Sequence, residues 1–181
     1  MLTGAQNCVG VSTIAARFAH SVSRDPSVRV LLVDTHLRAP SLDRIFTLPD
    51  GDSFYDLLTG ATGLDTLAPA SVENLHVLTA GRSISDPRAF FRRSIIGKIV
   101  NDLVSRYDLV VFDAPPIRDC VEARTLAAKV DGVVLVVRGG QTSRREGRLA
   151  IHQIGETGAP LLGVVLNSAR SYVPRWLYDR I

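Results

Sequence analysis

The sequence predicts a three-layer α/β/α sandwich in which a mostly parallel sheet lies between helices. Several short runs are apolar throughout rather than alternating, which is typical of strands buried on both faces of a parallel sheet. Helical stretches separate these runs, and such alternation indicates βαβ units with right-handed crossovers. A length of 181 residues fits one domain, so residues 1–181 are treated as a single unit.

The elements can be placed in order along the chain. The predicted strands are Met1–Thr3, Val28–Val33, Leu75–Leu78, Leu109–Phe112, Val133–Val137 and Leu161–Leu166, and the predicted helices are Ser12–Ser23, Asp86–Arg106, Val121–Lys129 and Ser143–Glu156. The first strand is short, because sheet strands usually have about five residues. We therefore expect that part of it is missing and that the segment was cut from a longer protein. Residues 171–181 are expected to form a short tail helix, with its helical turns over residues 175–181 after Pro174, that docks Trp176 and Leu177 on the domain or on a partner.

The composition favours an ordered protein and argues against a membrane-spanning protein or a cysteine metal site. The chain is 46% hydrophobic and 22% charged, with a formal net charge of +3, which argues against disorder. Arginines from Arg138 onward make the C-terminal quarter basic, which suits an anionic membrane face, an acidic partner or simply a solvated face. Cys8 and Cys120 fit no metal-ligand pattern, and no apolar run approaches the ~20 residues that span a bilayer. We expect a reduced cytosolic protein without a nucleic-acid partner.

A phosphate-binding loop is the first candidate site. Residues 4–13 read GAQNCVGVST between the first strand and the first helix. Such a loop needs amides that face the phosphates, a lysine against the β/γ oxygens and a hydroxyl on Mg²⁺. Gly10 and Ser12 occupy the positions of the last glycine and of that hydroxyl. Val11 stands where the lysine belongs, and Ala5 replaces the first glycine of the strict pattern.

Two further segments make the pattern specific. Residues 29–42 read RVLLVDTHLRAPSL, and residues 107–116 read YDLVVFDAPP. In this order the motifs resemble those of the bacterial tyrosine kinases of polysaccharide export, which are relatives of the MinD and ParA ATPases. The likeness continues through residues 85–90, 131–138 and 162–167, so it covers nearly the whole chain. The resemblance implies a fold of the P-loop NTPase type.

The resemblance also implies roles for single residues. The nucleotide would be bound by Gly10, Val11, Ser12 and Thr13 and, at its adenine edge, by Asn167. Asp34 matches the first aspartate of the second motif, which helps to hold magnesium and activates the attacking hydroxyl. Asp113 matches the aspartate that reaches Mg²⁺ through water. The implied cofactors are ATP or ADP and Mg²⁺, with Ser12, Asp34 and Asp113 as the magnesium-binding residues.

Three departures from the family pattern change the functional expectation. Val11 removes the positive charge that would neutralise a triphosphate, and His36 replaces the second aspartate of the Asp-x-Asp pair. The loss of one such group typically costs about 2–4 kcal/mol of transition-state stabilisation. The kinases also carry a tyrosine cluster after the last strand, where this chain offers only Tyr172 and Tyr178 as candidate phosphoacceptors. We therefore predict a degenerate kinase with weak or no nucleotide binding and phosphotransfer.

The resemblance implies a partner and a place. The partner would be a membrane polysaccharide co-polymerase, a chain-length regulator, at the inner face of the bacterial inner membrane, and homo-oligomers are a further expectation. Two alternatives stay open. One is an active tyrosine autokinase that binds MgATP despite Val11, and the other is a positioning ATPase similar to MinD or ParA. The stretch from Asp34 to Ser41 and the segment of residues 113–116 favour the kinase branch.

Overall fold

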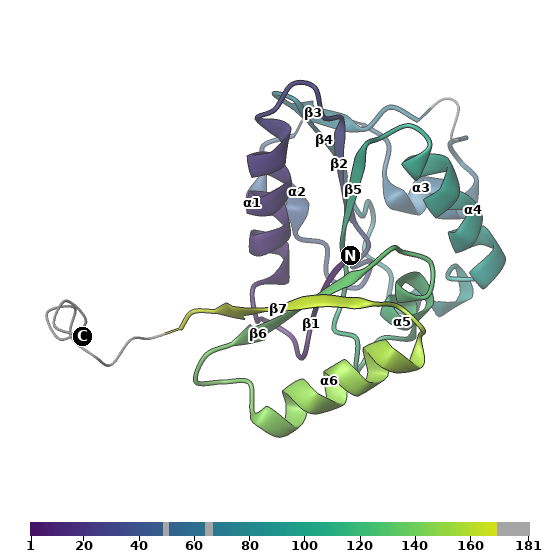
Figure 1. Ribbon diagram of the computed structural model, residues 1–181. Helices are drawn as coiled ribbons and strands as arrows, with labels where there is room; N and C mark the ends of the chain where they lie inside the picture. Colours follow the sequence, from purple (N-terminus) through teal and green to yellow (C-terminus); the bar gives the residue numbers. More distant parts are fainter. Residues whose placement is uncertain (49–50, 64–66, 170–181) are drawn as a thin grey trace, which may run out of the picture.

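The computed structural model describes residues 1–48, 51–63 and 67–169 (Figure 1). Its sheet has the strand order β3-β4-β2-β5-β1-β6-β7, and the described pairs are parallel except for the antiparallel pair β3–β4. The strands are β1 Leu2–Gly4, β2 Val30–Asp34, β3 Ala70–Val72, β4 Leu75–Leu78, β5 Leu109–Asp113, β6 Val133–Arg138 and β7 Leu161–Asn167. The mostly parallel sheet predicted from the sequence is confirmed.

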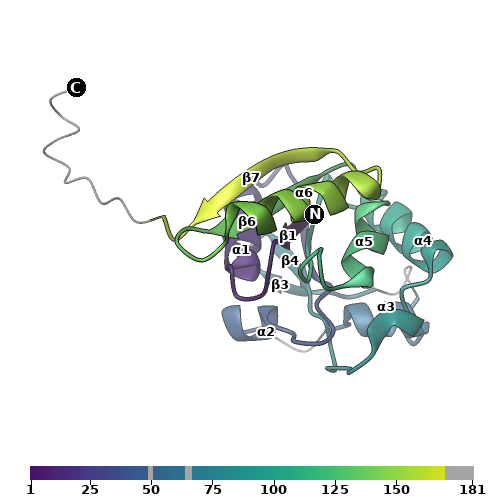
Figure 2. The ribbon, with the colours of Figure 1, turned by 90° about the horizontal axis from the view of Figure 1, so that it is seen from below.

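Helices cover both faces of this sheet. They are α1 Val11–Ser23, α2 Leu42–Ile45, α3 Phe54–Thr59, the 3₁₀ helix Pro87–Ala89, α4 Arg93–Val104, α5 Val121–Ala127 and α6 Arg144–Glu156. Figure 1 shows α1 and α2 to the left of β2 and β5, with α3 and α4 to the right. Figure 2 shows α6 alongside β6 and β7, with α5 between α6 and α4. The three layers of the predicted sandwich are therefore present.

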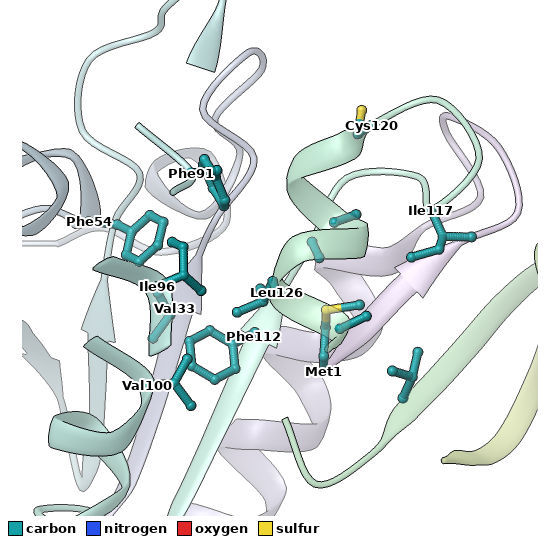
Figure 3. Close-up of a cluster of buried hydrophobic side chains, with 14 of the residues drawn as sticks. Met1, Val33, Phe54, Phe91, Ile96, Val100, Phe112, Ile117, Cys120 and Leu126 are labelled. Carbon is teal, nitrogen blue, oxygen red and sulfur yellow. The ribbon is translucent and has the colours of Figure 1, made fainter. Parts of the chain in front are cut away.

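The alternation of side chains along β2 explains the two layers. Leu31 and Val33 point into the larger apolar cluster, which holds side chains of α3, α4, α5 and α6. Val30 and Leu32 point into the other cluster, against α1 and α2. Both sets are completely buried, as expected for a central parallel strand. Figure 3 shows part of the larger cluster, with Phe112 of β5 beside side chains of α4 and α5.

The predicted helix Asp86–Arg106 is wrong in its first part. Asp86 caps a 3₁₀ turn over Pro87–Ala89, and the backbone of Arg92 is extended before α4 begins at Arg93. Proline favours a first helical turn, but the Asp86 carboxylate accepts the Arg88 N–H and closes only a short turn. The structure also shows α2, α3 and β3, which the sequence analysis did not predict. The predicted helix Val121–Lys129 ends earlier, at Ala127.

The carboxyl ends of β1, β2 and β5 meet at one edge of the sheet. The Thr35 N–H donates to the Asp113 carbonyl at 2.9 Å, and the Ile117 N–H donates to the Gly4 carbonyl at 3.2 Å. The segments that follow these three strands are therefore joined by backbone hydrogen bonds. In an open parallel sheet this edge is where ligands bind. The predicted tail helix 171–181, with Tyr172 and Tyr178, lies outside the described residues.

Candidate functional site

Two glycines give the phosphate loop its shape. Gly10 has φ 91°, a left-handed conformation that side chains rarely adopt, and it caps α1. A Cβ atom on Gly10 would collide with the Asn167 side-chain amide. A Cβ on Gly4 would lie 2.8 Å from the Gln6 carbonyl oxygen and from a Val9 methyl group. The loop therefore has the tight turn into a helix that phosphate binding requires.

Two side chains from the far end of the sheet hold this loop. The Asn167 side-chain amide at the end of β7 donates to the Val9 carbonyl at 2.8 Å. The Arg138 guanidinium at the end of β6 donates to the Cys8 carbonyl at 3.1 Å. Asn167 is thus in direct contact with the loop, and its predicted role at the adenine edge stays a prediction. The sequence analysis assigned Arg138 no role in this site, because its place beside the loop depends on the strand order.

Asp34 anchors the segment that follows β2. Its side chain is completely buried. One carboxylate oxygen accepts the His36 N–H at 2.9 Å, and the other accepts the N–H groups of Ser41 and Leu42 at 2.9 and 3.2 Å. Both oxygens are therefore engaged by backbone. The sequence analysis predicted Asp34 as a catalytic and metal-binding residue but missed this second role, which only the fold of residues 36–42 shows.

Asp113 is the unsatisfied carboxylate of the site. It is 1% exposed, and its Oδ2 atom is buried with no hydrogen-bond partner among the described residues. Burial and, to a lesser extent, the nearby Asp34 charge raise the pKa of Asp113 to about 7, although a hydrogen bond from Ser12 acts in the opposite direction. A buried carboxylate that lacks a partner is stabilised when a cation approaches it. Asp113 and Ser12 therefore fit the predicted magnesium position.

The magnesium position would have few protein ligands. No group of three or more His, Cys, Asp and Glu side chains that could hold a metal occurs in the described part of the chain. Mg²⁺ commonly takes one or two protein oxygens and completes its shell with phosphate and water. The Ser12 hydroxyl accepts a hydrogen bond from the Ser41 hydroxyl at 2.8 Å. A metal at Ser12 would have to share this oxygen with Ser41.

His36 does not replace the missing positive charge. Burial lowers the pKa of His36 below its usual value, and Arg38 lowers it further, while Asp34 and Glu122 oppose these effects. A histidine whose pKa is lowered in this way is neutral at pH 7. His36 therefore supplies neither the carboxylate of the family pattern nor a cation.

One cavity joins most of the predicted site residues, but Asp34 and Asn167 do not line it. It has a volume of about 1000 Å³ and is lined by residues 6–13 of the phosphate loop, by residues from 36 to 45, by Arg88 and by residues from 113 to 120. Val11, Ser12, Thr13 and Asp113 all lie on its wall. A volume of this size accommodates a nucleotide-sized ligand.

The helices of the described residues include none long and apolar enough to cross a membrane.

Comparisons with known proteins agree with this geometry. No protein-family model matches the chain. Over 168 residues the chain is 30% identical to CapB of Staphylococcus aureus, named as a tyrosine-protein kinase, with 92% of this chain and 73% of CapB covered. The kinase domain of VpsO is a solved structure that matches with a TM-score of 0.84 at 28% identity, covering 94% of this chain and 84% of that one.

More distant matches define what is shared. The chain is 27% identical over 169 residues to the tyrosine-protein kinase Wzc of Salmonella typhi, which covers 93% of this chain but 23% of Wzc. MinD of Pyrococcus horikoshii matches with a TM-score of 0.77 at 18% identity, over 99% of this chain and 75% of that one, which shows a shared fold alone. Because the CapB match reaches 30% identity over most of both proteins, the chain belongs to the family of bacterial tyrosine kinases.

Proposed function

We propose that this domain is a degenerate tyrosine kinase of exopolysaccharide synthesis and export. In this proposal it binds magnesium nucleotide weakly, transfers no phosphoryl group, and acts through contacts with a membrane polysaccharide co-polymerase. Family membership supplies the pathway, and the residues of the cavity supply the argument against catalysis.

The observation that carries the proposal is the place of Val11. Its side chain lies on the wall of the cavity next to Ser12, at the first position of α1, where the family has a lysine. Phosphoryl transfer depends on fixed cations that stabilise the negative charge of the transition state. An isopropyl group offers none, so the helix N-terminus and the loop amides are left to hold the phosphates.

Of the two acidic positions in the second motif, the first is retained as Asp34 and the second is replaced by His36. Three backbone N–H groups engage both oxygens of the Asp34 carboxylate. If Asp34 turned to a metal or a substrate, the segment of residues 36–42 would lose these hydrogen bonds. His36 is a neutral ring where the pattern has a carboxylate. Of the three carboxylates expected in the family site, Asp113 is the one with an oxygen that faces no hydrogen-bond donor of the described residues.

The partner follows from the family rather than from a surface of this domain. The match to Wzc spans 23% of that protein, so the homologous domain there is one part of a much longer chain. We extend the proposal to a position at the inner face of the bacterial inner membrane, next to such a co-polymerase. Co-purification of this domain with the co-polymerase from the same genome, in detergent extracts, would test this part of the proposal separately from nucleotide binding.

Calorimetric titration and mass spectrometry test the catalytic part. Titration with MgADP or MgATP should give a dissociation constant well above the micromolar range. After incubation with MgATP, peptide mass spectrometry should find no phosphotyrosine, including at Tyr172 and Tyr178. A micromolar or tighter constant, or phosphotyrosine that depends on ATP, would contradict the proposal.

The active autokinase stays the second candidate because the cavity is intact. The loop turn at Gly10, the Ser12 hydroxyl and the unpartnered Asp113 oxygen are the parts that MgATP needs apart from the lysine. A lysine or arginine from a neighbouring subunit could complete such a site. Autophosphorylation whose rate per molecule rises with protein concentration would favour this candidate over the degenerate one.

A further inference from the structure

Four basic side chains line the cavity of the phosphate loop: His36, Arg38, Arg44 and Arg88. Three of them are already accounted for. His36 is a half-buried imidazole, which lacks the permanent charge of a guanidinium. The Arg38 guanidinium donates to the buried Glu122 carboxylate at 2.8 Å and to the Ser85 carbonyl at 2.6 Å. The Arg88 guanidinium holds Asp86 through contacts of 2.8 and 3.2 Å.

Arg44 differs from the other three. Its side chain is exposed. Within the part of the chain that the structure describes, its guanidinium makes neither a hydrogen bond nor an ion pair. The Arg44 charge is therefore not paired with a carboxylate, although Asp113 and Asp119 line the same cavity. A free guanidinium presents five donors that match phosphate oxygens in a forked geometry.

The start of α2 is fixed against the phosphate loop, and this fixes the place of Arg44. The Ser41 hydroxyl donates to the Ser12 hydroxyl at 2.8 Å, and Asp34 accepts the N–H groups of Ser41 and Leu42. The Arg44 N–H donates to the Ser41 carbonyl at 3.1 Å, which closes the first turn of α2. Arg44 thus stands one helical turn from the residue that contacts the loop.

The geometry points to Arg44 as the cation that binds phosphate in this cavity, in place of the lysine that Val11 replaces. The ligand class is a phosphate-bearing anion seated on the amides of the phosphate loop, such as a nucleoside diphosphate. This inference rests on the proposed function and deepens it, because it names the group that gives the weakened site its residual affinity. Arg44 supplies its charge from α2 rather than from the first position of α1, so it compensates for charge without restoring the position of the missing lysine.

Titration with sodium tripolyphosphate and with MgADP, at low ionic strength, tests the inference. The Arg44→Gln variant should bind either probe about tenfold more weakly than the unmodified domain, as expected for the loss of one charge-assisted hydrogen bond. The Arg44→Lys variant should retain part of this affinity. Arg24→Gln is the matched control, because Arg24 is exposed at the other end of α1 and does not line the cavity.

The same substitution in a second parent protein, Val11→Lys, separates a loss of phosphate binding from a loss of folding. In a Val11→Lys domain the lysine supplies the charge, so Arg44→Gln should then cost clearly less than tenfold. Thermal unfolding of all variants checks that α2 is intact. Equal affinity of the Arg44→Gln and unmodified domains would overturn the inference, and so would the absence of tripolyphosphate binding at millimolar concentration. Tight binding or phosphotransfer by the unmodified domain would contradict the proposed function but not the role of Arg44.

Discussion

The phosphate loop and the segment after β2 differ in which part of the predicted nucleotide site they retain, its shape or its charge. The loop has the required shape, with Gly10 in a left-handed conformation and the Ser12 hydroxyl in the cavity, but it lacks the lysine charge. The segment of residues 36–42 keeps the charge of Asp34, but backbone amides engage both of its oxygens. The phosphate loop therefore has the shape of a nucleotide site without the lysine charge. The segment after β2 has the Asp34 charge, which stabilises the backbone of that segment.

This difference suggests which constraints act on each region. A loop between a buried strand and a helix must satisfy its backbone whether or not it binds a ligand, and glycines at two positions do so here. The side chain at the lysine position, by contrast, is not needed to satisfy the backbone of the loop. A carboxylate that holds three N–H groups cannot be replaced without cost, even in a domain that performs no catalysis.

Replacing Asp34 should have the largest effect on stability. Asp34→Ala leaves the N–H groups of His36, Ser41 and Leu42 without this acceptor, one of them buried and two partly buried, so we expect the free energy of unfolding to fall by roughly 3–5 kcal/mol. Asp34→Asn keeps one acceptor oxygen and should cost less. Urea unfolding measures both, with Asp43→Ala on the exposed side of α2 as the control. An unchanged stability of Asp34→Ala would show that the carboxylate does not hold the segment.

Replacing Asp113 should stabilise the domain in a way that depends on pH. The folded pKa of about 7 lies above the ordinary value of 3.8, so folding favours the protonated form. The contribution of this group is complete below about pH 4 and is lost as the pH rises through about 7. Asp113→Asn should therefore match the parent at pH 4 and exceed its free energy of unfolding at pH 8 by roughly 2–4 kcal/mol. An equal free energy of unfolding for the two proteins at pH 8 as well as at pH 4 would contradict this account of Asp113.

The smallest effect is expected at Cys8, in the phosphate loop. Cys8 has φ 59°, in the left-handed region that costs a side chain roughly 1 kcal/mol. Glycine adopts this conformation freely, so Cys8→Gly should raise the melting temperature relative to Cys8→Ser, which keeps the strain while removing the thiol. The free energy of unfolding of Cys8→Gly should exceed that of Cys8→Ser by about 0.5–1 kcal/mol, and this difference measures the backbone strain at residue 8. A serine variant as stable as the glycine variant would show that the loop is not strained at this position.

The sequence was sufficient for every described strand except β3, because short runs that are apolar throughout are typical of strands buried in a parallel sheet. It was also sufficient for α1, α5, α6 and, apart from its start, α4. It was insufficient for α3, although Ser53 and Asp56 form a capping box there, because the helix Phe54–Thr59 is too short to show a helical period. The placement of Asp113 beside Ser12 followed from family motifs. The spatial roles of Arg138 and Arg44 did not, since they depend on the strand order and on the hydrogen bonds that fix α2.

The most direct test of the central claim is a MgADP titration of the unmodified domain beside Val11→Lys. The account predicts a dissociation constant well above micromolar for the unmodified domain. It predicts measurably tighter binding for the variant, since the loop turn, Ser12 and Asp113 are in place. Phosphotyrosine should stay absent from both after incubation with MgATP, because His36 stands where the family pattern has its second aspartate and backbone N–H groups engage both oxygens of Asp34. Micromolar binding by the unmodified domain, or full kinase turnover in Val11→Lys, would contradict the claim.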